Sequence, residues 1–136
     1  MFLIVAALTM QPPLADQLRE KRETLPATRR LIEEGLARGA PGDETLARAV
    51  MRQVEEAGLV WGTCVRDTHG DARGQSTTAE FDDALRRCVG DREEYLNWVR
   101  LGARVHGESP DDPRVADMVD TLERRMREAA TAHERR

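Results

Sequence analysis

Four glycines, Gly39, Gly58, Gly90 and Gly107, each follow an amphipathic, charge-rich segment of the chain. Most of the segments that come after them open with an Asp or Thr, which are residues suited to capping a helix N-terminus. Because glycine readily ends a helix, this alternation predicts helices joined by short turns. We therefore expect a mainly α protein, an all-α bundle of five to six helices joined by Gly and Pro turns.

Length and charge limit the number of domains and the kinds of partner. A chain of 136 residues suits one core, so residues 1–136 are expected to form a single helical domain. The formal net charge is −4, and acidic and basic side chains are mixed along the whole chain. Nucleic-acid binding needs a basic surplus on one face, so no nucleic acid is expected as a partner. Lys21 is the single lysine among many arginines, which is typical of a GC-rich bacterial genome.

Capping residues and prolines predict where individual helices begin and end. The predicted starts are Thr24 with Pro26 in the first turn, Asp43, Thr77 with Glu80, Asp91 with Glu94, and Asp112 with Pro113. The predicted ends are Gly39, Gly58 and Gly107. Between these limits, apolar residues recur every three or four positions, as one buried helix face requires.

One stretch, residues 59–65, is the least helix-like part of the chain. It combines β-branched and aromatic side chains with an internal glycine, a composition typical of strands. A lone strand leaves its backbone unpaired, and residues 2–8 are the other segment of similar character. The alternative fold is therefore an α+β protein with a short two-stranded ribbon formed by 2–8 and 59–65.

The apolar run at the start of the chain bears on targeting and on fold. No Lys or Arg precedes it, so a secretion signal is the minor alternative and a cytoplasmic location is expected. The run is too short to span a bilayer, so no transmembrane segment is expected. Phe2 to Val5, followed by Pro12 and Pro13, resembles the opening of small ferredoxin-like αβ enzymes, which implies the mixed fold. The resemblance covers the first quarter of the chain and assigns a role to no residue.

The two cysteines, Cys64 and Cys88, are separated by a polar segment and a predicted helix. A disulfide would staple that segment, but in a reducing cytoplasm both residues would be small buried hydrophobic groups, and we expect free thiols. Zinc would need further ligands at regular spacing, and only His69 and His106 are scattered nearby. No metal and no cofactor are therefore predicted.

The polar segment 66–76 carries the best candidate for a ligand or metal site. Asp67, His69 and Asp71 alternate there, which brings three titratable side chains close together in sequence. The spacing does not match an EF-hand loop, and an ordinary solvated turn explains the same residues.

Three large aromatic residues offer a second candidate site. Trp61, Tyr95 and Trp98 could line an apolar pocket between helices, or they could simply fill the core, as large aromatic residues do in small domains.

The sequence contains no local pairing of nucleophile and base, which favours a non-catalytic function. The first hypothesis is a small acidic helical module for protein–protein interaction or regulation, with a protein partner or a second copy bound through an apolar helix face. Its candidate contact residues are Phe2, Leu3, Ile4 and Val5, which would form an apolar patch if exposed. The alternatives are a small-ligand-binding domain with the aromatic pocket, and an enzyme that uses the 66–76 loop.

Overall fold

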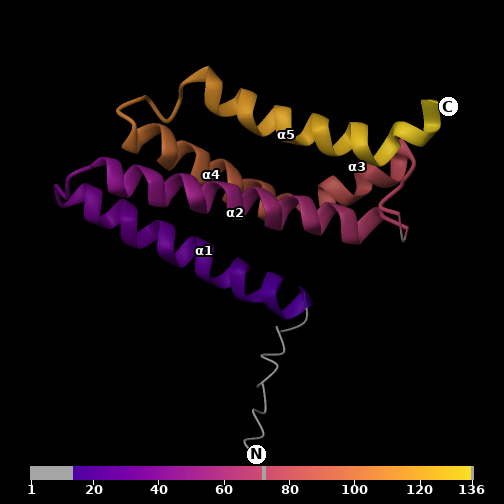
Figure 1. Cartoon of the computed structure of the whole chain (residues 1–136), viewed down its shortest axis with the longest axis horizontal. Helices are drawn as coiled ribbons and strands as arrows, with labels where there is room; N and C mark the ends of the chain where they lie inside the picture. Colours follow the sequence, from indigo (N-terminus) through magenta and orange to yellow (C-terminus); the bar gives the residue numbers. More distant parts are fainter. Residues whose placement is uncertain (1–13, 72, 136) are drawn as a thin grey trace, which may run out of the picture.

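A computed structural model of the chain describes residues 14–71 and 73–135. Within these residues the chain is helical and contains no strand, which confirms the predicted all-α bundle. The elements are α1 (Leu14–Ala37), α2 (Glu44–His69), α3 (Thr78–Arg87), α4 (Val89–Val105), α5 (Pro113–Thr131) and a short 3-10 helix, Ala132–Arg135. The four other α-helices all contact α2, which lies between α1 and α5 in Figure 1. None of the described helices is both long and apolar enough to cross a membrane.

Helix α2 extends well beyond the end predicted for it. The predicted stop at Gly58 is wrong, and so is the alternative of a strand at 59–65, because α2 continues to His69. Val60, Trp61 and Val65 are buried against the other helices. Burial of this face outweighs the weak local preference of β-branched and aromatic residues for strands. The other strand of the alternative ribbon, residues 2–8, lies outside the described residues.

Gly58 allows close helix packing rather than ending a helix. A Cβ atom at this position would lie 3.3 Å from Leu122 Cδ2 and 3.3 Å from Tyr95 Cε2. The absent side chain therefore lets α4 and α5 approach the middle of α2. Gly90 is also helical, in the first turn of α4, but a Cβ there would meet nothing within 4 Å.

We predict opposite outcomes for the same substitution at these two glycines. Gly58→Val should lower the free energy of unfolding by about 1 to 3 kcal/mol, because the added methyl groups overpack the contact with Tyr95 and Leu122. Gly90→Val should stay within about 0.5 kcal/mol of wild type, because it is exposed and valine is a better helix former than glycine. Urea unfolding of both variants measures the difference. Equal losses at the two sites would show that Gly58 has no special packing role.

The first described helix passes through a proline. The predicted break near Thr24 is wrong, because α1 is one helix with Pro26 in its interior. Contacts on both sides of the proline hold this helix in place. Before it, Lys21 pairs with Glu56 of α2 and Leu25 is buried, and after it Arg29 pairs with Glu94 of α4. Tertiary packing thus overrides a local signal that normally favours a helix start.

Ion pairs join α1 to α4. Arg29 Nε donates to Glu94 Oε2 at 2.7 Å, and Arg22 Nη2 donates to Asp91 Oδ2 at 3.0 Å. The predicted capping pair Asp91 and Glu94 is therefore wrong, because α4 begins at Val89 and both carboxylates bind α1 instead. The side chains of Arg29 and Glu94 are only 13% and 17% exposed, so water screens this pair less than a surface pair.

The remaining predicted caps are confirmed. Asp43 accepts a hydrogen bond from Leu46 N at 2.8 Å, and Thr77 and Glu80 form a reciprocal capping box at the start of α3. Asp112 caps α5, with Pro113 in its first turn. Gly39 and Gly107 follow α1 and α4 with φ of 88° and 76°, a left-handed conformation that glycine adopts without strain.

A disulfide connects Cys64 in α2 to Cys88 at the junction of α3 and α4. The expectation of free thiols is therefore wrong. The packing of α3 on α2 brings the two Cα atoms to 6.0 Å, within the range that a disulfide spans, although 24 positions separate the residues in sequence. Sequence spacing alone carried no information about this distance.

Reduction of this disulfide should destabilise the protein by about 3 kcal/mol, because an open loop of this length gains conformational entropy in the unfolded chain. Denaturant unfolding with and without dithiothreitol measures the effect. A Cys64→Ala/Cys88→Ala double variant serves as the control, since reductant should leave its stability unchanged. If reductant destabilises that variant as much as wild type, the effect does not come from this disulfide.

Candidate functional site

The three aromatic candidates lie in the core. Trp61 and Trp98 are completely buried, and the ring of Tyr95 packs 5.8 Å from that of Trp61, centroid to centroid. Burial raises the pKa of the Tyr95 hydroxyl above its ordinary value. Tyr95 borders an open hollow beside α5, whereas neither tryptophan borders any of the described cavities, so the two tryptophans fill space in the core.

The structure separates the three candidates of the polar segment. Asp67 is exposed on α2, and His69 is the last residue of that helix, with its ring 5.6 Å from the ring of Phe81. Asp71 Oδ1 accepts hydrogen bonds from Arg73 N at 2.8 Å and Gln75 N at 3.1 Å. These bonds lower the pKa of Asp71 and fold the loop into a tight turn. Nowhere in the described part of the chain do three or more His, Cys, Asp or Glu side chains form a group suited to a metal ion.

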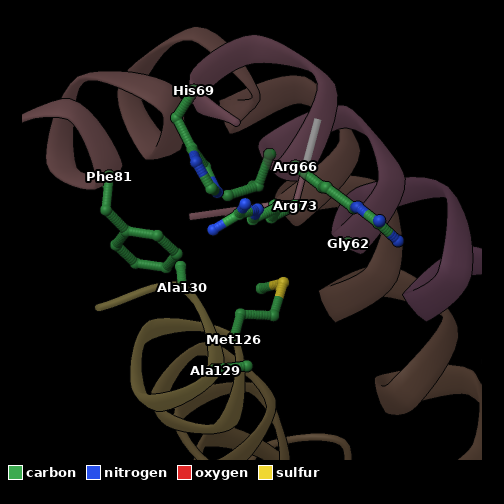
Figure 2. Close-up of a pocket in the computed structure, with 10 residues that line it drawn as sticks. Gly62, Arg66, His69, Arg73, Phe81, Met126, Ala129 and Ala130 are labelled. Carbon is green, nitrogen blue, oxygen red and sulfur yellow. The ribbon is translucent and has the colours of Figure 1, made fainter. Parts of the chain in front are cut away.

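His69 borders a cavity of about 320 Å³ between the end of α2, the loop after it, α3 and α5. We call this the cationic cavity. Its lining consists of Gly62, Val65, Arg66, His69, Arg73, Gly74, Phe81, Met126, Ala129 and Ala130. Figure 2 shows His69 and one of the two arginines directed toward the space beside Phe81, Met126 and Ala130, while the other arginine extends toward Gly62. One side of the cavity is therefore cationic and the other is apolar.

The charge in this cavity is not balanced by the residues that line it. Two arginines and a histidine border the space, and none of the lining residues is acidic. Arg66 and Arg73 form no ion pair with any described residue, although Asp71 adds a weaker attraction to Arg73. His69 Nδ1 is buried and has no hydrogen-bond partner among the described residues. A buried polar atom without a partner is unusual in a folded protein and calls for an explanation.

A second, smaller hollow of about 120 Å³ lies between α2, α4 and α5. We call it the methionine groove, because Met51 and Met118 border it and are 36% and 41% exposed. Its other lining residues are Val54, Val99, Gly102, Ala103, His106, Glu108, Arg114 and Val115. The groove lies toward the connection between α4 and α5, whereas the cationic cavity lies toward the opposite end of α2 (Figure 1).

Polar residues at the rim of the methionine groove are held in place. Arg114 Nη2 lies 2.9 Å from Asp112 Oδ2 and 3.2 Å from Glu108 Oε1. His106 Nδ1 lies 2.7 Å from the carbonyl oxygen of Gly102, at the end of α4. The rim therefore consists of paired charges around an apolar floor, an arrangement common at protein interfaces.

His69 and His106 are residues of these two sites that the sequence offers as possible ligands, but no local pattern groups the lining residues into two sites. Arg66 lies in the segment 66–76, which the sequence predicts as polar, and Met126 carries no signal beyond the apolar periodicity of its helix. Met51 and Met118 carry a weak signal, because methionine is common at adaptable binding surfaces. The rest of each site forms through tertiary packing, so no local pattern could have identified it.

Comparison of the chain with protein-family models, with curated proteins and with solved structures finds no match. What the protein does is therefore inferred from its own geometry.

Asp112 provides a pH-dependent test of the groove rim. Its hydrogen bonds with the side chain and backbone N–H of Arg114 lower its pKa to about 2. Because this pKa is depressed in the folded protein, the stabilisation is present above the unfolded value of about 3.9 and is lost as the pH falls through about 2. We expect the Asp112 carboxyl carbon to titrate near that value in an NMR experiment.

Arg114→Gln should move this midpoint upward, toward the ordinary aspartate value, because the charged hydrogen-bond donor is lost. Arg124→Gln removes an exposed arginine from the same helix and should leave the Asp112 titration unchanged. If the titration midpoint of Asp112 does not shift in Arg114→Gln, the side chain of Arg114 is not what lowers the pKa of Asp112.

Proposed function

We propose that this protein is a non-catalytic interaction module that binds a protein partner through the methionine groove. The observation that carries the proposal is an apolar hollow flanked by two half-exposed methionines, Met51 and Met118. Methionine is flexible and polarisable, so it adapts to the surface of a partner.

The size of the hollow favours a protein side chain over a metabolite. Pockets for small molecules usually range from about 300 to 1,000 Å³, whereas this hollow is about 120 Å³. It suits one large apolar side chain of the kind that anchors a protein interface. An amphipathic helix could place such a side chain on the apolar floor while its polar residues meet Glu108 and Arg114 at the rim.

The partner that we assign is a second copy of the chain. In a two-fold symmetric contact, the same patch on each subunit must supply both a projecting side chain and a space to receive one. Met118 is 41% exposed and borders the hollow. Each copy therefore carries the projecting side chain, Met118, next to the hollow that would receive Met118 of the other copy. The earlier candidates Phe2, Leu3, Ile4 and Val5 lie outside the described residues and remain a separate proposal for a contact segment.

The disulfide bears on where such a module works. Disulfides persist mainly in oxidising compartments, so the Cys64–Cys88 bond supports an exported location rather than the expected cytoplasmic one.

The alternative of an enzyme based on residues 66–76 has less support. The Asp71 carboxylate is engaged in the turn, and Asp67 is exposed on the helix before it, apart from the cavity.

Sedimentation equilibrium of the full, oxidised chain tests the proposal. Wild type should self-associate, and Met118→Glu should weaken the dimer by about ten-fold or more, because a carboxylate would be buried in the apolar hollow. Leu59→Glu is the matched control, since Leu59 is 67% exposed on α2 and does not border the groove.

Wild type that remains monomeric at about 1 mM, or a Met118→Glu variant that associates as wild type does, would contradict the proposal. Unfolding of both variants confirms that they fold, and substitutions at such exposed positions should change stability by only about 0.5 kcal/mol.

A further inference from the structure

We propose that the cationic cavity binds a small organic carboxylate whose body is apolar. This site is separate from the methionine groove: it involves the opposite end of α2, together with α3 and the C-terminal part of α5. Neither site requires the other, so each can be tested alone.

The polar side of the cavity suits a carboxylate. The guanidinium groups of Arg66 and Arg73 border the space without an ion-pair partner in the described part of the chain. A guanidinium donates paired hydrogen bonds to the two oxygens of a carboxylate, which makes arginine well suited to this group. The side chain of His69 also borders the space, although its Nδ1 is itself buried.

Two carboxylates that interact with the cationic side of the cavity, Asp71 with Arg73 and Glu80 with His69, already accept hydrogen bonds from backbone N–H groups. Asp71 accepts hydrogen bonds from two backbone N–H groups of its own turn. Glu80 Oε1 accepts from Thr77 N at 3.0 Å as part of the capping box of α3. Both carboxylates therefore stabilise local backbone structure and form no ion pair with Arg66 or Arg73, so the guanidinium N–H groups stay available to an anion.

The apolar side of the cavity favours an anion with a hydrocarbon body. Phe81 is completely buried at the cavity wall, and its ring is held by Arg127, whose guanidinium carbon lies 4.8 Å from the ring centroid. Met126, Ala129 and Ala130 face the cations from α5 (Figure 2). An aromatic or branched aliphatic body would contact these side chains, whereas inorganic phosphate or sulfate would leave them uncovered.

The loop that carries Arg73 is fixed by the structure around it. Gly74 has φ of 72°, and a Cβ there would lie only 3.1 Å from Arg66 Nε, so glycine lets the loop pack on this guanidinium. Ser76 N donates to the carbonyl oxygen of Ala130 at 3.0 Å, which ties the loop to α5. The cationic side is therefore held against the apolar side before any ligand arrives, which lowers the entropic cost of binding.

The volume supports a ligand of modest size. At about 320 Å³ the cavity is near the lower end of the range for small-molecule sites, which suits a single aromatic ring with one carboxylate. Benzoate is therefore the probe that we would use, with benzyl alcohol as an uncharged probe of similar shape and sulfate as an anion without an apolar body.

NMR titration of the oxidised full chain with each probe tests the proposal. We expect benzoate to shift the signals of the Met126 methyl group and the His69 ring with a saturable dependence on concentration. Benzyl alcohol and sulfate should each bind at least about ten-fold more weakly than benzoate. Benzyl alcohol lacks the negative charge that the arginines bind, and sulfate lacks the apolar body that contacts α5.

Two variants locate the binding. Arg66→Gln should weaken benzoate binding about ten-fold or more, whereas Arg52→Gln, a matched substitution at an exposed position of the same helix, should have no effect. Ala129→Phe places a ring at an exposed part of the cavity lining and should abolish binding without unfolding the protein.

Three outcomes would overturn the proposal. One is the absence of saturable shifts with benzoate at up to about 10 mM. Another is equal binding of sulfate and benzoate, which would indicate simple attraction to arginine. The third is unchanged benzoate binding in Ala129→Phe, which would place the probe elsewhere. Circular dichroism confirms that each variant is folded, so a loss of binding cannot be confused with a loss of structure.

Discussion

One apolar face of α2 organises the rest of the described structure. Its residues Val50, Val54, Trp61 and Val65 are buried, and α1, α3, α4 and α5 all contact this helix. A helix of 26 residues is about 39 Å long, so its two ends lie far apart. The methionine groove forms near one end, where α4 and α5 cover α2, and the cationic cavity forms near the other, where α3 and α5 cover it.

Helix α1 is attached in a different way from the other helices. Leu25 is its one fully buried apolar side chain in the described structure. Leu18, Ile32 and Leu36 are partly buried against the core, and ion pairs from Lys21, Arg22 and Arg29 add charged contacts. Exposed ion pairs add little stability, and partly buried pairs mainly fix which groups meet. The pair between Arg29 and Glu94 therefore sets the position of α1, whereas the apolar face of α2 and the disulfide hold α2, α3 and α4 together.

Structural features that depend on residues close together in the chain, such as helix caps, can be predicted from the sequence. Asp43, Thr77 and Asp112 were correctly identified as caps, because each side chain bonds to a backbone N–H only two or three residues away. Features that depend on contacts between distant residues cannot be predicted in this way. The stretch 59–65 has the composition of a strand, yet it is helical because the neighbouring helices bury one face of it. Gly58 lies inside the same helix, where its missing side chain allows close packing against Tyr95 and Leu122.

The sequence predicts little of either site, because contacts between distant residues form both of them. Arg66, Phe81 and Met126 come from three different helices, and only the packing of α3 and α5 against the end of α2 brings them around one cavity. Their residue types, a charged helix surface residue and two apolar core residues, are ordinary in any helical protein. What sets them apart is an arginine facing apolar side chains across an open space, a relationship that exists only in three dimensions. The disulfide follows the same rule, since Cys64 and Cys88 become partners only through the packing of α3 on α2.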